Sequence, residues 1–332
     1  QLYPKLEKKL GVNLSINDSF LSKNYFENLN FFTDQEQNIK TQDAKLIIAG
    51  SIGNDPRFRA YALDYMKKNI HFSLIHHGAQ YNIFNEPYYT IYEELICNSK
   101  VIYGNIAKQK KIKTLGSDKN IFGQKITYLS RTDDYLSKIN KQRSKKNINP
   151  IKSLKNKKIL YFSSEFTALR YGPFRDVHPI VYLDWQNKLL DWIKNETQIN
   201  PIVRLHPKRQ TKVFDPINFK DQKNFSIKSL KEADVFCIDY PTTSFAYVNA
   251  TNKPVIFFDL GMRKLSKSSL KIIKKRCLYT KVKWANIEAS FRNIRKELNK
   301  NFTNEFTETF TLERKCKNEA KNVAQHIADK IK

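Results

Sequence analysis

The hydrophobic pattern in the first half of the chain alternates short apolar runs with longer amphipathic segments. Residues 45–50 form an apolar run that ends in a glycine, and residues 55–68 repeat large apolar side chains at helical spacing. Further strands are expected at 71–76, 100–103 and 125–129, and a further helix at 88–97. Strands separated by helices of this length pair in parallel, so the pattern predicts a doubly wound sheet.

The second half repeats this alternation. Its apolar runs predict strands at 158–162, 201–205, 234–239 and 254–258, its amphipathic segments predict helices at 181–194 and 243–251, and an amphipathic helix is expected at 312–331. The fold class is therefore α/β, with two Rossmann-like, doubly wound domains.

Composition suggests where the domains begin and end. Residues 141–158 contain eight basic residues, no acidic ones and a proline, which is typical of a linker. The expected division is an N-terminal segment at 1–40 that is a remnant of an upstream region, a first Rossmann-like domain at 41–140, the linker at 141–158, a second Rossmann-like domain at 159–311 and a C-terminal helix at 312–332.

The net charge narrows the choice of partners. The chain carries 59 Lys and Arg against 32 Asp and Glu, a formal charge of +27, so a non-enzymatic nucleic-acid-binding protein is a rival interpretation. We find neither aromatic residues interleaved with basic ones nor a known nucleic-acid-binding motif, which disfavours that rival. Two acid-free basic blocks, 141–158 and 263–283, instead favour peripheral contact with an anionic membrane.

Cysteine spacing and hydropathy address the cellular compartment. The four cysteines lie far apart with no CxxC pair, which argues against structural zinc and for reduced thiols. No apolar run approaches the roughly 20 residues that span a bilayer. We expect a cytoplasmic protein that contacts the inner face of a membrane only peripherally.

Polar residues gather where the predicted strands end. Ligands of open α/β sheets bind beyond the carboxyl ends of the strands, so these residues are the candidates for chemistry. In the second domain they are Ser163, then Arg204 with His206 and Lys208, then Tyr240 with Thr242, Thr243 and Ser244.

The segment 239–254 is the strongest single unit. A strand, a proline turn and a hydroxyl-rich helix start follow one another, and the free N–H groups and dipole of a helix N-terminus attract phosphate. Ordinary capping by Thr242 or Thr243 is the alternative, although capping needs one hydroxyl and three are present.

Two further clusters complete the candidate set. Arg204 and Lys208 can neutralise a diphosphate, and His206 can hydrogen-bond a phosphoryl oxygen, although a surface cluster of a lysine-rich chain is the alternative for Lys208. In the first domain His77, beside a glycine, is the candidate general base, whereas His76 is expected to be a buried structural residue. Asp55, Glu86 and Glu93 are rival bases.

The chain resembles a family of bacterial O-antigen and surface-carbohydrate transferases. The matches are Phe58-Arg59-Ala60, His76 to Tyr81, Glu93 with 101–104, Leu169-Arg170-Tyr171-Gly172, 203–207 and 239–254, and together they span roughly 46–259. More distantly, the His-Pro and Ser/Thr elements are similar to those of CDP-glycerol glycerophosphotransferases and of sialyl- and Kdo-type transferases that use CMP-activated sugars. One departure stands out, because the family's Gln-His-Gly-Gly turn is His-His-Gly-Ala here.

The resemblance implies a GT-B-like fold in which two Rossmann-like domains face a central cleft. It implies an acceptor on the first domain, with His77 as base, and a nucleotide donor on the second, with its phosphate held by Arg204, His206 and 242–244. Matched motif positions would add Gly78, Gln80, Tyr81, Arg170 and Tyr240 to the cleft.

These observations predict a glycosyltransferase that moves a sugar from a nucleotide-activated donor to a bacterial surface-glycan acceptor. A CMP-linked nonulosonic or Kdo-like acid is the favoured donor, and transfer of glycerol phosphate from a CDP-glycerol-type donor is the alternative. No metal and no cofactor beyond the donor are expected, since the acidic pair 133–134 fits a helix start better than a metal site.

Overall fold

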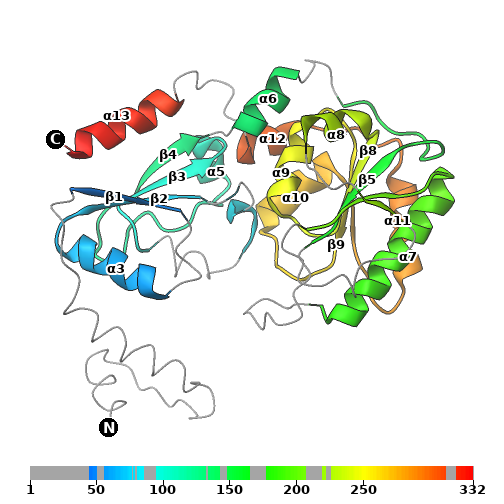
Figure 1. The fold of residues 1–332 in the computed structure, drawn as a ribbon, viewed down its shortest axis with the longest axis horizontal. Helices are drawn as coiled ribbons and strands as arrows, with labels where there is room; N and C mark the ends of the chain where they lie inside the picture. Colours follow the sequence, from blue (N-terminus) through cyan, green and yellow to red (C-terminus); the bar gives the residue numbers. More distant parts are fainter. Residues whose placement is uncertain are drawn as a thin grey trace, which may run out of the picture.

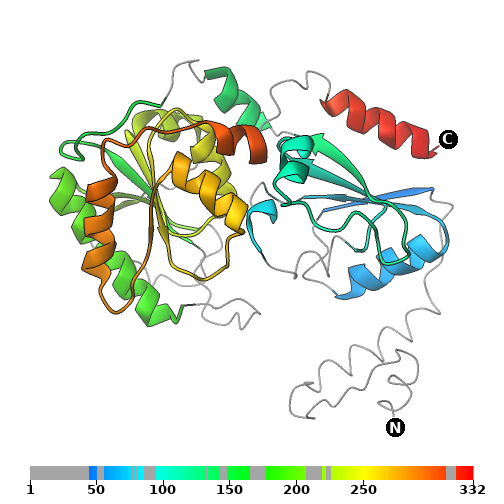
Figure 2. The same ribbon diagram turned by 180° about the vertical axis from the view of Figure 1, so that it is seen from behind.

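Two parallel β-sheets, each packed against helices, make up the described part of a computed structural model (Figure 1). The structure describes residues 45–50, 56–76, 78, 81–85, 95–131, 134–142, 148–164, 177–206, 219–221, 226–311 and 319–331. The two sheets belong to separate halves of the chain and lie side by side in both views (Figures 1 and 2). The expected α/β class with two parallel sheets is confirmed.

The first sheet has four parallel strands in chain order. They are β1 (Leu46–Ala49), β2 (His71–Ile75), β3 (Ser99–Tyr103) and β4 (Thr127–Arg131). Helix α3 (Pro56–Lys67) covers one face, where its Ala62 and Met66 are buried in one cluster with Phe72 and Leu74 of β2. Burial of this apolar stripe fixes which way the β2 residues point, because neighbours on a strand face opposite sides.

The C-terminal helix α13 (Glu319–Ile331) lies on the other face of this first sheet (Figures 1 and 2). That face is polar at its centre: His71 Nε2 lies 2.9 Å from Ser99 Oγ, which donates to Ser73 Oγ at 2.9 Å. The His71 ring meets the ring of His326 on α13 edge to face at 5.5 Å. Burial, then Lys330 and then His326 lower the pKa of His71 to about 4, so the histidine is neutral at pH 7.

The second sheet has six parallel strands in the order β10-β9-β8-β5-β6-β7. The strands are β5 (Ile159–Phe162), β6 (Ile202–Arg204), β7 (Lys220–Asp221), β8 (Val235–Ile238), β9 (Val255–Asp259) and β10 (Leu278–Lys281). The chain adds β6 and β7 on one side of β5 and then returns to add β8 to β10 on the other. This is the Rossmann-type order, with its reversal between β5 and β8.

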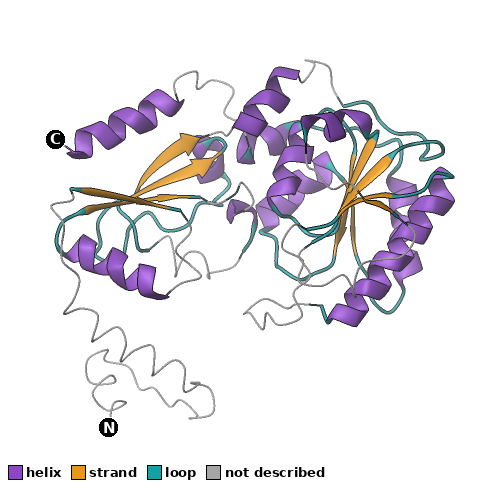
Figure 3. Ribbon diagram, in the orientation of Figure 1, coloured by secondary structure: helices purple, strands orange, loops and turns teal. Residues whose placement is uncertain are grey.

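Helices cover both faces of the second sheet, as Figure 3 shows. On one face α7 (Pro179–Thr197) and α11 (Ile287–Glu297) pack through Trp192 and Phe291, whose rings stack at 5.0 Å. On the other, the buried cluster joins α8 (Ile227–Glu232), α9 (Thr243–Ala250), α10 (Lys267–Arg276) and α12 (Glu305–Phe310) to the strands. The strands are apolar on both faces because both are covered.

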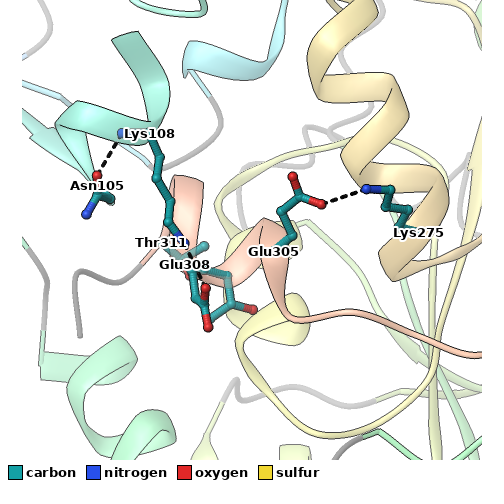
Figure 4. A network of polar contacts seen from close by, with 7 residues as sticks. Asn105, Lys108, Lys275, Glu305, Glu308 and Thr311 are labelled. Atoms are coloured by element: carbon teal, nitrogen blue, oxygen red, sulfur yellow. Dashed lines mark hydrogen bonds and ion pairs between the residues drawn. The ribbon is translucent and has the colours of Figure 1, made fainter. Parts of the chain in front are cut away.

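Backbone contacts join the two halves. A short 3-10 helix, η1 (Tyr81–Ile83), leads to Phe84, which bridges to Leu265 of the second half. Helix α5 (Ile106–Lys111) meets α12, and the Asn105 N–H donates to the Thr309 carbonyl at 3.0 Å. In Figure 4 the same junction shows Lys108 paired with Glu308 at 2.8 Å. Helix α6 (Asp134–Gln142) packs on α9.

All eight strands expected from the sequence are present, with ends that differ by one or two residues. Two short edge strands, β7 and β10, and the helices α5, α8, α10, α11 and α12 were not expected from the sequence, whereas α6 begins at the helix start expected at 133–134. The expected helix at 88–97 lies mostly outside the described residues. The three described cysteines, Cys97, Cys237 and Cys277, are buried and form no disulfide with one another.

Two basic stretches differ from what composition suggested. Within the described part of the expected linker, the apolar residues Ile148, Ile151 and Leu154 are buried in the core of the second half, while the residues between and after them are exposed. In the block 263–283, Arg263 and Arg276 are only 6% and 0% exposed, and the block is therefore not a uniform charged surface. Charge counts missed this because an arginine can be buried where carbonyls or an aromatic ring receive it.

Candidate functional site

The reversal of strand order places the carboxyl ends of β5 and β8 next to each other, where ligands of such sheets bind. Ser163 and Ser164 follow β5, and Asp239 and Tyr240 follow β8. Strand β6, the neighbour of β5 on its other side, ends at Arg204. The residues that the sequence placed at separate strand ends thus lie at one edge of the sheet.

Ser163 and Arg204 are in direct contact. The Ser163 N–H donates to the Arg204 carbonyl at 3.1 Å, and the Ser163 hydroxyl lies 3.5 Å from the same oxygen. The Arg204 side chain is half-buried, and its Nη1 donates to the Leu205 carbonyl at 3.2 Å. The guanidinium is therefore held near this edge, and a guanidinium is a side chain that can bind an anion. His206 is half-buried two residues further on.

Thr242 occupies the position just before helix α9, but its side chain does not cap the helix. Its N–H donates to the Tyr240 carbonyl at 2.9 Å, which closes the turn, but its side chain makes no capping hydrogen bond. Five other described helices have such a side-chain cap, from Asn105, His178, Ser226, Ser266 and Asn286, whereas α12 also lacks one. Capping by Thr242, the alternative raised by the sequence, is not supported. The half-buried hydroxyls of Thr242, Thr243 and Ser244 line a helix start whose N–H groups lack this partner.

Beneath this turn lies a buried carboxylate, Asp239, which is 1% exposed. Its Oδ2 accepts hydrogen bonds from the Tyr161 hydroxyl, from the Tyr182 hydroxyl at 2.9 Å and from Trp185 Nε1 at 3.2 Å. Tyr182 in turn accepts from Ser164, at 2.9 Å from its N–H and at 2.7 Å from its hydroxyl. The network links the two strand ends that border the candidate site.

Burial governs the protonation of this network. It raises the pKa of Asp239 to about 6, although hydrogen bonds from Tyr161, Tyr182 and Trp185 oppose the shift. Burial and the nearby Asp239 raise the pKa of Tyr161 and of Tyr182 well above the usual value. At pH 7 an ionised carboxylate therefore faces protonated tyrosine hydroxyls.

The candidate base region is described only in part. Six of the predicted site residues lie outside the described residues, so their predicted roles stay predictions. They are His77, Asp55, Glu86, Gln80, Lys208 and Arg170. Gly78 is buried and Tyr81 opens η1. His76 is 3% exposed, and burial, Lys100 and Arg131 lower its pKa well below the usual value, which fits the structural role expected of it.

Sequence reasoning missed Tyr161, Tyr182 and Trp185, which read as ordinary core residues. The available signal was a Tyr and a Trp three positions apart on a helix whose polar atoms need a buried partner. Among the residues that the structure describes, no three His, Cys, Asp or Glu side chains gather as a metal site would need. No helix in the described ranges is long and apolar enough to cross a membrane.

Comparison with known families identifies the class of protein. The model of the LIC12162 family transferases matches residues 14–275, most of the chain. The chain belongs to the LIC12162 family of transferases. The resemblance to transferases is thus confirmed, and its narrower part, towards O-antigen and CMP-sugar enzymes, stays a prediction. The search of curated proteins found no match to this chain.

Solved structures resemble the transferase only loosely. The MurG protein of Acinetobacter baumannii is 12% identical, with a TM-score of 0.40 over 91% of this chain and 76% of that one. The glycotransferase of kitacinnamycin is 9% identical, with a TM-score of 0.43 over 94% and 85% of the two chains. Roles of individual residues in this transferase must therefore be argued from its own geometry.

Proposed function

We propose that this transferase is a glycosyltransferase of GT-B-like architecture that binds a nucleotide-activated sugar at the edge between β5 and β8. The single observation that carries the proposal is the uncapped start of α9 at the reversal of strand order. Its N–H groups and three hydroxyls offer donors to a phosphate, and the dipole of the helix favours the negative charge.

The neighbouring cations support the same assignment. Arg204 is the last residue of β6, which lies on the side of β5 away from β8, and His206 comes two residues later. A guanidinium can bind two phosphoryl oxygens at once, so Arg204 and α9 would hold the diphosphate or monophosphate of a donor from two directions. Ser163, between them, would donate one further hydrogen bond.

The proposed reaction is transfer of the sugar from the phosphate of the donor to an oxygen of the acceptor. An oxygen of the acceptor would attack the anomeric carbon, its proton would pass to His77 or to Glu86 or Asp55, and the bond from the anomeric carbon to the phosphate oxygen would break. Arg204, His206 and the start of α9 would stabilise the charge that develops on the departing phosphate. The donor phosphate binds where the charge grows, so binding and catalysis use the same groups.

The finer assignments follow the sequence. A CMP-linked nonulosonic or Kdo-like acid is the proposed donor and a bacterial surface glycan the proposed acceptor, bound by the first domain at the cytoplasmic side of the membrane. The exposed lysines of 263–283, among them Lys264, Lys267, Lys271 and Lys274, would supply peripheral contact with anionic lipid. No metal is proposed to take part.

A binding measurement tests the donor class. CMP-, CDP-, UDP- and GDP-linked donors should be compared by thermal shift and calorimetry, with a nucleic acid as the competing ligand. The proposal expects one nucleotide class to stabilise the protein through preferential binding to the folded state. Stabilisation by nucleic acid alone would overturn it, and a glycerol phosphate product from CDP-glycerol would establish the alternative transfer reaction.

Two variants test the site itself. Thr242→Val keeps the shape of the side chain and removes its hydroxyl, and loss of a hydrogen bond to a charged phosphate costs about 1.5–3 kcal/mol, or about 10–100-fold in affinity. Thr303→Val, at an exposed loop position, is the matched control and should bind as the wild type does. Equal affinities for the two variants would remove the start of α9 from the site.

A further inference from the structure

The hydrogen-bond network under the candidate site connects segments that are distant in the sequence. Ser164 follows β5, Tyr182 lies in the first turn of α7 and Asp239 follows β8. Figure 1 shows β5 and β8 adjacent, with α7 packed on the sheet. A rigid link among these three segments would set the width of the crevice above them.

Tyr182 occupies the centre of this link. A tyrosine hydroxyl has one proton and two lone pairs, so it can donate once and accept twice. Tyr182 donates to Asp239 Oδ2 at 2.9 Å and accepts from the N–H and the hydroxyl of Ser164, at 2.9 and 2.7 Å. These three bonds join the end of β5 to the end of β8, and the Tyr182 hydroxyl also lies 3.3 Å from the hydroxyl of Tyr161.

Asp239 provides the fixed end of the link. It directly precedes Tyr240, whose carbonyl closes the turn into Thr242. Its Oδ2 also accepts hydrogen bonds from Tyr161 on β5 and from Trp185 on α7, so two elements hold the carboxylate. Three donors on one buried oxygen leave the side chain little freedom, although the other oxygen, Oδ1, is buried without a hydrogen-bond partner among the described residues.

We propose that Tyr182 and Asp239 are positioning residues, which hold Ser163 and Ser164 at a fixed distance from the turn at 240–242 and so preform the phosphate crevice. This inference rests on the proposed function and deepens it. Neither residue needs to touch the donor. A preformed site binds more tightly because the cost of ordering its groups is already met in the free protein.

Tyr161 offers a matched control for Tyr182. Both hydroxyls are buried and both donate to Asp239 Oδ2. Tyr161 also accepts from Gln186 at 3.3 Å, but no hydrogen bond joins it to Ser164 among the contacts of the described residues. Tyr161→Phe and Tyr182→Phe therefore remove comparable buried hydroxyls, while only Tyr182→Phe frees Ser164.

The test compares donor affinity with stability in these two variants. For the nucleotide donor that the wild type binds best, we expect Tyr182→Phe to weaken binding about 10-fold and Tyr161→Phe less than about 3-fold, at similar losses of unfolding free energy. Losses of affinity that are equal, or that follow stability alone, would overturn the positioning role. Should Tyr182→Phe fail to fold, Ser164→Ala removes the 2.7 Å contact with a smaller change and should weaken binding in the same direction.

Hydrogen exchange separates this inference from the proposed function. Independently of any ligand, Tyr182→Phe should speed exchange of the Ser164 N–H and of the amides at 242–245 more than Tyr161→Phe does. A wild type that binds no nucleotide, together with this exchange pattern, would refute the proposed function and leave the link between the strand ends intact. Unchanged exchange at Ser164 would refute the link itself.

Discussion

At the scale of single residues, Asp239 shows how one carboxylate serves both folding and the site. Hydrogen-bond donors around Asp239 favour its ionised form, and burial favours its neutral form. The effect of burial is the larger, so the pKa of Asp239 rises to about 6. A group whose pKa is higher in the folded state binds protons there more tightly than in the unfolded chain. Its contribution to stability is therefore largest at low pH and falls as the pH rises through the window from 3.8 to about 6.

Asp239→Asn removes this titration. The unfolding free energy of the wild type relative to the variant should fall between pH 4 and pH 7, by on the order of 3 kcal/mol at about 1.4 kcal/mol for each unit of pKa. Urea unfolding at a series of pH values measures the difference. A wild-type-minus-variant difference that stays flat would contradict the raised pKa.

The sequence predicts the position of a residue well where a strand end marks it, and the roles of these residues stay predictions. Ser163, Arg204 and Thr242 were predictable because apolar runs end just before them, and the structure brings the three strand ends to one edge. The partners of Asp239 were not predictable. Tyr182 and Trp185 become its donors only once the rotation of α7 about its axis and the face of the sheet it covers are known.

At the scale of elements, helix α9 is fixed at the end opposite the candidate site. The buried Arg276 of α10 donates to the carbonyls of Val248, Asn249, Thr251 and Lys253, where α9 ends and the following turn leads to β9. A cation is favourable at a helix C-terminus, and the fork of a guanidinium can reach several carbonyls at once. Arg276 thus holds the end of α9 that lies opposite the candidate site.

Arg276→Ala should lower the unfolding free energy by about 3 kcal/mol, because buried carbonyls lose their donors. Lys275→Ala is the matched control: the neighbouring lysine is exposed and paired with Glu305 at 3.0 Å, as Figure 4 shows, and its loss should cost less than about 1 kcal/mol. Chemical denaturation of both variants checks the contrast. Equal losses would mean that Arg276 acts only as a surface charge.

Elements were predictable in proportion to their burial. The strands expected from continuous apolar runs are present, whereas β10 reads Leu-Tyr-Thr-Lys and follows a helix whose last turn is basic, so its pattern resembled an exposed segment. Charge also concealed the burial of Arg276. The periodicity of the C-terminal residues predicted the helix α13 but not the sheet that it covers. An amphipathic stripe shows that a helix packs on something, without specifying which surface.

At the scale of the whole molecule, the junction between the halves includes one very close approach of two backbone segments. Gly104 has a φ of +83°, and a Cβ on it would lie 2.3 Å from the Thr309 carbonyl oxygen of α12. Glycine is therefore needed twice here, for its backbone conformation and for the space it leaves. The ion pair between Lys108 and Glu308 closes the same junction (Figure 4).

Gly104→Ala should destabilise the protein more than its conformation alone would require. Gly123 is the matched control, since its φ is +75° but a Cβ there would meet nothing within 4 Å. We expect about 1–2 kcal/mol for Gly123→Ala from the left-handed backbone, and at least about twice that for Gly104→Ala. Urea unfolding measures both, and equal values would show that α12 yields to the added methyl group.

Helix α13 gives the molecule an order of assembly. Strands β1 to β4 leave the ribosome long before residues 319–331, yet those residues cover the face on which His71 and Ser99 lie. During synthesis this face therefore stays without α13 until after all the strands of the second sheet have been made. Cutting the chain between the two sheets would place the first sheet and the helix that covers it on different fragments.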